Sequence, residues 1–276
     1  MNNTKIDFLP KTKKFILTFA FFYVFLDPAS CFTFPASKPK HNKQTMTALN
    51  AASLTQYGPA ATSLFNNMKT PASILAGSMV PLGILNTLPK HDTKPETKLM
   101  KIVRQTYLLV SVFSFGSEVL AVMYATMAVN KLTETAIAPA ASLFDLLKRD
   151  FALAWTGTNS HFVFGMFGLM YMICVRSFFM VRVSNTNKYF ASSIYSVVGS
   201  LCFLMLSAVN RQVAAGTGTG RNVSYLFYSY VRLLFKQAYG SFGMCQSIGL
   251  ALGLVSIAGV IMGSLHVANQ DKEKEE

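Results

Sequence analysis

The sequence predicts an all-α integral membrane protein in which four transmembrane helices form a bundle and two amphipathic helices lie at the membrane interface. Composition gives the first indication, because 51% of the 276 residues are hydrophobic and only 13% are charged, whereas soluble domains carry about a quarter charged residues. The second is the apolar run at residues 104–130, in which Glu118 is the one acidic or basic residue between the flanks. That run is long enough to cross a hydrocarbon core of about 30 Å at about 1.5 Å per residue.

Small and polar residues of this first span fall on one helical face. They are Tyr107, Ser111, Ser114, Glu118, Ala121, Ala125 and Ala128. The bulky apolar residues lie largely outside that face, and they are Val112, Phe113, Phe115, Leu120, Val122 and Met127. A small, polar stripe backed by bulky residues is typical of a helix that packs its stripe against protein and turns its other face to lipid.

Many of the basic residues behind the net charge of +13 lie in the first 104 positions and in short loops beside apolar runs. This placement suits targeting and membrane topology better than a nucleic-acid surface, so we expect no nucleic-acid partner. The cysteines have no metal-ligand spacing and are interpreted as packing residues. The predicted mature chain has no Ser-His-Asp arrangement, HExxH motif or paired acids, so we expect no enzyme activity and no metal.

The leader has the organisation of a targeting sequence. A basic cluster at residues 11–14 precedes an apolar run at 15–26 that is too short to span a bilayer, and small residues precede Cys31. This order predicts a signal peptide over residues 1–31. No Asp or Glu occurs from Pro28 to His91, and lysines are scattered among hydroxyl-bearing residues. Residues 32–70 are therefore predicted to be a disordered transit peptide.

The junction after the signal peptide resembles the bipartite plastid presequences of diatoms and other algae with complex, red-derived plastids. In that family of leaders an Ala-Ser-Ala-Phe-Ala-Pro type motif begins the transit peptide at its Phe. Ala29, Ser30, Phe32 and Pro35 stand in the pattern, whereas Cys31 replaces an Ala and one extra residue precedes the Pro. The resemblance implies import into a plastid. The alternative is an ordinary secretory protein with a basic linker.

Residues 71–103 are predicted to lead into the membrane domain, which covers residues 104–266. Pro71, Pro81 and Pro89 interrupt their apolar first part, which favours a partly buried loop and leaves a fifth span as the alternative. A basic flank follows. Within the later loops, residues 139–155 and 225–239 have the pattern of interfacial amphipathic helices.

Three further spans are predicted at about residues 160–182, 189–210 and 241–266, followed by a charged, disordered tail at 267–276. Each span carries small residues at helical spacing that favour close helix packing. These packing positions are Gly165 and Gly168 in the second span, Ser192, Ser196 and Ser200 in the third, and Gly249, Gly253, Gly259 and Gly263 in the fourth.

Glu118 is the leading candidate for a functional residue, because an acid in the middle of a bilayer is costly unless it is paired, hydrogen-bonded or protonated. Arg176 is a candidate partner, with snorkelling to the interface as its alternative. Ser114, Ser192 and Ser196 are candidates to line a polar pathway with Glu118. No cofactor is expected, and His161 and His266 are the residues that would ligate a chlorophyll if one were bound.

These patterns predict a non-enzymatic structural, assembly or interaction subunit of a plastid membrane, with the thylakoid favoured over the envelope. Its expected partners are the lipid bilayer and other membrane helices, including those of a second copy of the chain. The alternative is a small solute or proton-coupled transporter that uses Glu118. Small-residue packing stripes outnumber reactive groups, and that balance favours the structural subunit.

Overall fold

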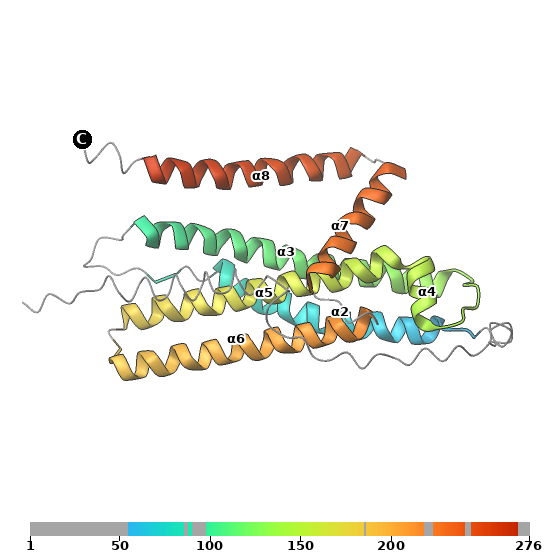
Figure 1. Cartoon of the computed structure of the whole chain (residues 1–276), viewed down its shortest axis with the longest axis horizontal. Helices are drawn as coiled ribbons and strands as arrows, with labels where there is room; N and C mark the ends of the chain where they lie inside the picture. The colour runs from blue at the N-terminus through green and yellow to red at the C-terminus, as the bar shows by residue number, and fades with distance from the viewer. Residues whose placement is uncertain are drawn as a thin grey trace, which may run out of the picture.

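The computed structural model describes residues 55–85, 88–89, 98–184, 186–217, 223–240 and 244–269. The predicted signal peptide lies outside these residues, as do the basic residues before Lys98 and the predicted tail beyond Asn269; residues 267–269, predicted to be disordered, belong to the helix that ends at Asn269. Figure 1 shows that the described chain is helical. Its elements are α2 (Gly58–Met79), the π-helix η2 (Val80–Leu85), α3 (Lys98–Glu134), α4 (Leu143–Asp150), α5 (Ala152–Val183), α6 (Lys188–Thr217), α7 (Val223–Gly240) and α8 (Met244–Asn269).

For the described residues the prediction of an all-helical fold is confirmed, and four helices among them are long and apolar enough to cross a membrane. They span Gly58–Leu85, Met100–Glu134, Ala152–Val183 and Lys188–Val209. The number of candidate spans agrees with the sequence prediction, but the segments that form them are not the same four. The expected fourth span lies in α8, where the described apolar stretch is shorter, Ala251–Gly263. The first of the four arises from a segment that was predicted to be a loop.

Residues 58–85 form a helix, so the predicted loop and the C-terminal part of the predicted disordered leader are corrected. Pro59 stands in the first turn, where proline costs no hydrogen bond. Pro71 lies inside α2, and Pro81 falls within the π-helical turns of η2; such wide turns accommodate a break in the hydrogen-bond ladder. The packing of one face of α2 outweighs the helix-breaking tendency of these prolines. The buried residues of that face are Ala61, Phe65, Ala72, Ala76 and Met79.

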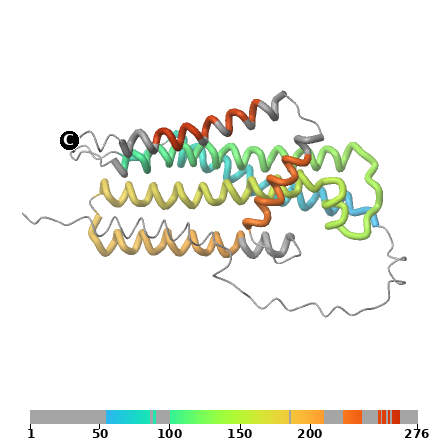
Figure 2. The backbone as a smooth tube through the Cα atoms, turned by 45° about the horizontal axis from the view of Figure 1, so that its top comes forward, coloured from blue at the N-terminus to red at the C-terminus, as the bar shows by residue number. Residues whose placement is uncertain are grey.

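The core lies between α2, α3 and α5, because α3 makes its most extensive contacts with these two helices. Figures 1 and 2 both show the long helices running alongside one another, with α7 crossing them at a steep angle. All seven residues of the small, polar face of α3 are buried. Bulky residues such as Phe113 and Met127 are exposed. The predicted division of this helix into a packed face and an outer face is therefore confirmed.

The first predicted interfacial helix is divided between two elements. Ser142 caps α4, where its side chain accepts a hydrogen bond from the backbone of Asp145, and α5 begins at Ala152. Trp155 thus belongs to α5 instead of the loop. Its ring packs edge to face on the Phe65 ring, with the two ring centroids 5.9 Å apart. The apolar face of α4 packs on protein through Leu146 and Leu147.

Candidate functional site

The described helices make their most extensive contacts between α3 and α5, and Glu118 lies inside this seam. A Cβ atom added at Gly165 would lie 2.0 Å from Glu118 Oε1, and one added at Gly168 would lie 1.5 Å from Ser114 Oγ. Only glycine leaves room for these side chains. The carboxyl group of Glu118 therefore fills the notch that Gly165 leaves in α5.

Several polar groups are buried along this seam without a hydrogen-bond partner among the described residues. They are both carboxyl oxygens of Glu118, Ser160 Oγ and His161 Nδ1. The neighbouring hydroxyl of Ser114 does not supply one, because it donates to the Val110 carbonyl at 2.6 Å within its own helix. An unpaired carboxylate in such a place would be far more costly than a neutral carboxyl group. The site can therefore hold a proton on the Glu118 carboxyl group.

Arg176 does not pair with Glu118, so that prediction is wrong. The carboxyl group meets Gly165, and eleven residues of α5, about 16 Å of helix, separate Gly165 from Arg176. The guanidinium instead donates from Nη1 to the Leu82 carbonyl at 2.9 Å. Tyr107 donates to the same oxygen at 2.6 Å.

Two arginines at this end of the core donate to backbone carbonyls, Arg176 to one near the end of η2 and Arg104 to two beyond it. A helix end leaves its last carbonyls without intrahelical partners, and a cation there also matches the helix dipole. Arg104 donates to the carbonyls of Leu88 and Pro89, which follow η2 in the chain. Its guanidinium lies 5.2 Å from the centre of the Phe179 ring. Sequence analysis missed this arrangement because it did not recognise the helix whose end Arg176 contacts.

His161 joins α5 to α3 and α7 through two tyrosines. Its Nε2 lies 2.7 Å from the Tyr230 hydroxyl, which lies 3.3 Å from the Tyr124 hydroxyl, and the Tyr124 ring stacks on the imidazole. Burial raises the pKa of Tyr230, and its contact with Tyr124 adds to that shift. A protonated tyrosine hydroxyl can both donate and accept, so Tyr230 can bond Nε2 of His161 and the Tyr124 hydroxyl at the same time.

Of the two histidines considered as pigment ligands, the structure describes the surroundings of His161 only. His161 offers no open ring nitrogen, because Nε2 bonds Tyr230 and Nδ1 is covered by protein. A magnesium ion bound to a large macrocycle needs such an opening, so the surroundings of His161 do not fit chlorophyll. The side chain of His266 lies outside the described residues.

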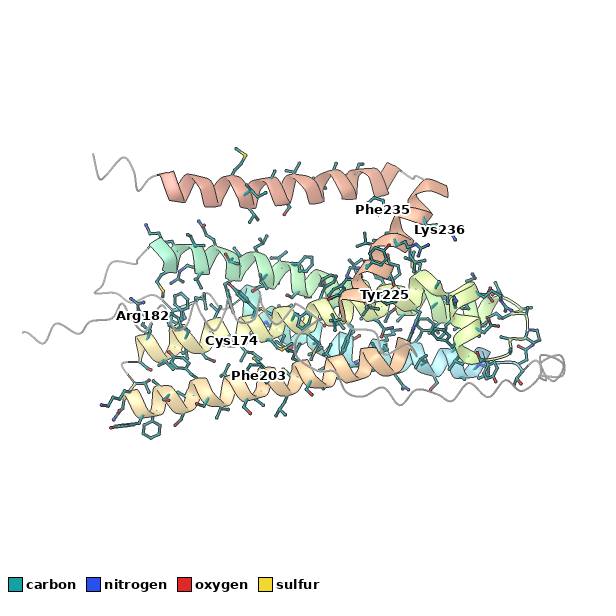
Figure 3. All side chains as sticks on the ribbon, in the orientation of Figure 1. Cys174, Arg182, Phe203, Tyr225, Phe235 and Lys236 are labelled. Carbon is teal, nitrogen blue, oxygen red and sulfur yellow. The ribbon has the colours of Figure 1, made fainter. Side chains whose placement is uncertain are left out.

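The remaining small-residue positions do not join the Glu118 site. Ser192, Ser196 and Ser200 are exposed, because α6 faces α5 with another side that carries Cys202, whose Sγ lies 3.5 Å from Sγ of Cys174. Figure 3 shows Cys174 beside α6. The α8 glycines are exposed as well, and a Cβ atom added at any of them meets nothing within 4 Å: Gly249, Gly253, Gly259 and Gly263. They were predicted to pack within the bundle or against another chain, and the described residues show no packing within the bundle.

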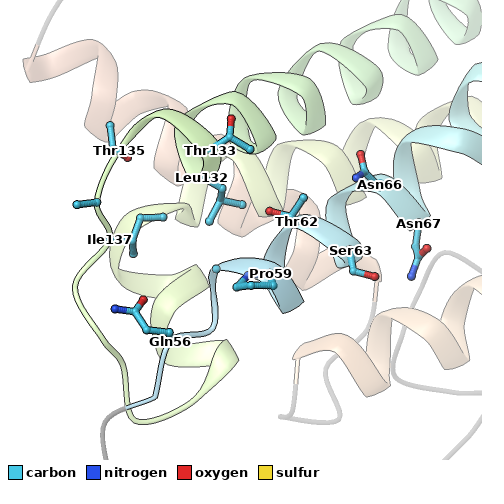
Figure 4. Close-up of a pocket in the computed structure, with 12 residues that line it drawn as sticks. Gln56, Pro59, Thr62, Ser63, Asn66, Asn67, Leu132, Thr133, Thr135 and Ile137 are labelled. Atoms are coloured by element: carbon cyan, nitrogen blue, oxygen red, sulfur yellow. The ribbon is translucent and has the colours of Figure 1, made fainter.

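A second candidate site is an open groove where α2 begins and α3 ends (Figure 4). Its volume is about 790 Å³, and none of the residues that line it is charged. The lining combines apolar groups with the amides and hydroxyls of Gln56, Asn66, Asn67, Thr62, Ser63 and Thr133. Most of its α2 residues were predicted to be part of the leader, so sequence analysis did not identify it.

Comparison of the chain with protein-family models, with curated proteins and with solved structures finds no match.

Proposed function

We propose that the protein is a multi-pass membrane protein that acts as a non-enzymatic structural or assembly subunit, with other membrane helices as its partners. The observation that carries this proposal is the closed seam between α3 and α5. The Glu118 side chain fills the space beside Gly165, so the seam offers a tight joint between helices and no room for a solute. Such small-residue contacts hold helices together in lipid.

The outer helices supply the surface for a partner. The serine face of α6 and the glycine face of α8 are exposed, although small residues in apolar helices typically mark close helix contacts. The packed core of α2, α3 and α5 would then hold the subunit together, while α6 and α8 contact a neighbour. That neighbour is another membrane protein or a second copy of this chain.

Native purification tests this proposal. Membranes that carry the tagged full chain are washed with alkaline carbonate and solubilised in mild detergent, and the co-purifying proteins are quantified by mass spectrometry. We expect the chain to resist the wash and to elute with a stoichiometric helical partner. A Gly253→Ile variant should fold but lose that partner, because the new side chain covers the glycine face. Extraction by carbonate, or elution as a lone monomer, would contradict the proposal.

The second candidate function is a proton-coupled carrier, and the unpartnered carboxyl group of Glu118 favours it. A Glu118→Gln substitution separates the two functions, because glutamine keeps the size of the side chain but cannot exchange a proton. Normal accumulation with loss of proton flux in reconstituted vesicles would support the carrier. Unchanged flux with normal accumulation would support the structural subunit, in which a neutral side chain suffices.

We also propose a plastid membrane as the location, with the thylakoid favoured over the envelope. The support is the resemblance of the leader to algal bipartite presequences, which rests on residues outside the described part of the chain. A fluorescent fusion of the first 90 residues, expressed in an alga with a complex plastid, should enter the plastid. Secretion of that fusion would contradict this location.

A further inference from the structure

The groove at the start of α2 is a chemical environment distinct from the Glu118 seam. It is bounded by the first turns of α2, the end of α3 and the segment that follows α3. An antiparallel backbone bridge between Thr55 and Ala140 ties the two chain segments together beside it. The groove is therefore held by the fold, although it is open on one side.

The groove presents hydrogen-bonding groups that the fold itself does not use. The side-chain amides of Gln56, Asn66 and Asn67 make no hydrogen bond to other described residues. The hydroxyl of Thr133, another lining residue, donates to the Asn130 carbonyl at 2.9 Å, which leaves its oxygen able to accept a hydrogen bond. An amide both donates and accepts, and a set of amides and hydroxyls matches a ligand that carries several hydroxyl groups.

The lack of charge in the groove lining and the position of the groove narrow the class of ligand further. An anionic headgroup is recognised by Lys or Arg, and no charged residue lines the groove. Gly58 and Glu134 are also the ends of two candidate spans. If these helices cross a bilayer as proposed above, the groove lies at headgroup level. Its volume of about 790 Å³ is in the range of small-ligand sites.

We propose that this groove binds the uncharged, polyhydroxylated headgroup of a membrane glycolipid. The proposal rests on the membrane insertion proposed above. The sugar hydroxyls bond the amides of α2, Leu132 and Ile137 cover the apolar edge of the sugar ring, and the acyl chains remain in the bilayer. The site thereby selects lipids by headgroup and fixes the depth of this end of the bundle.

The test uses the full chain in nanodiscs that contain equal amounts of phosphatidylcholine, phosphatidylglycerol and a diglycosyl diacylglycerol. Lipids that stay bound after release into detergent are quantified by mass spectrometry. We expect the glycolipid to be enriched about tenfold over the other two, since a net gain of one or two hydrogen bonds corresponds to roughly that ratio. An N66A/N67A variant should lose the enrichment. N130A is the matched control, because Asn130 is an exposed residue of α3 that does not line the groove.

Each outcome decides the proposal. Equal retention of the three lipids, preference for the anionic lipid, or full enrichment in N66A/N67A would overturn it. Complete competition by a free methyl glycoside would show that the groove takes a soluble sugar, which also overturns the lipid assignment. A Thr62→Val variant, expected to weaken enrichment, provides a second test if the double variant fails to fold by circular dichroism. Failure to enter nanodiscs overturns the membrane proposal too, whereas entry without enrichment overturns this one alone.

Discussion

A Gly168→Ala substitution tests the α3–α5 seam most directly. The new Cβ atom would lie 1.5 Å from Ser114 Oγ and 2.5 Å from Ser114 Cβ. The hydroxyl can rotate away, but the Cβ atom of Ser114 is fixed to the backbone of α3. The two helices therefore have to move apart by about an ångström, and this movement also loosens the neighbouring contact of Glu118 with Gly165.

Overpacking of this kind costs about 1–3 kcal/mol, and the better helix propensity of alanine offsets at most about 1 kcal/mol of that cost. We expect Gly168→Ala to lower the free energy of unfolding by about 1–2 kcal/mol. Gly116→Ala is the matched control, because Gly116 lies in the middle of α3 with nothing within 4 Å of an added Cβ atom. It should be neutral or slightly stabilising.

The assay is thermal unfolding of the purified full-length variants in detergent, followed by circular dichroism, together with a double-substitution cycle. Ser114→Gly removes the obstructing atoms, so in the Gly168→Ala background it should recover most of the lost stability through a favourable coupling of about 1–2 kcal/mol. Equal stability of Gly168→Ala and Gly116→Ala, or additive effects in the cycle, would show that α3 and α5 do not meet in this register.

Three further substitutions examine other parts of the fold. Phe65→Ala should cost about 3–5 kcal/mol in unfolding experiments, because the ring is fully buried; a small loss would mean that α2 is dispensable. Arg176→Met should destabilise the protein by about 1.5–3 kcal/mol through loss of a charged hydrogen bond to the η2 carbonyl, and Arg176→Lys should recover part of this. The side-chain hydrogen bond from Arg149 lowers the pKa of Asp150, so their pair stabilises the native state above about pH 4 and stops doing so on acidification. Asp150→Asn should remove that small, salt-sensitive pH dependence from the melting curve.

Sequence analysis could identify the packed face of α3 because the relevant information is local. Residues three and four apart share one side of a helix whatever surrounds it, and small residues on that side permit close approach. The burial of Ser114, Glu118 and Ala121 follows from this spacing alone. The pairing of Glu118 with Arg176 required a second quantity, the register between two helices, which depends on the whole interface. Gly165 and Gly168 set that register by admitting the larger side chains of α3.

The first helix could not be recognised for a different reason. Its prolines and its acid-free composition both favour a leader or a loop when each is considered alone. Tertiary packing overrides these local preferences, because Phe65 and Met79 are fully buried on one face of the helix. A similar limit applies to α6. The serines at every fourth position show which face can pack closely, but the face with Cys202 is the one that packs against α5 in the structure.

The division between the inner and outer helices is a further support for the proposed assembly function. In the α3–α5 seam, each glycine position is matched by a side chain that needs the space, as Gly168 is by Ser114. On α8 the same residue type has no such counterpart among the described residues, since a Cβ atom at Gly253 would meet nothing. Glycine in a helix costs about 1 kcal/mol relative to alanine, so a glycine face is expected where another helix requires it. Because none of the described residues covers that face, a helix from another molecule is the occupant that we propose for it.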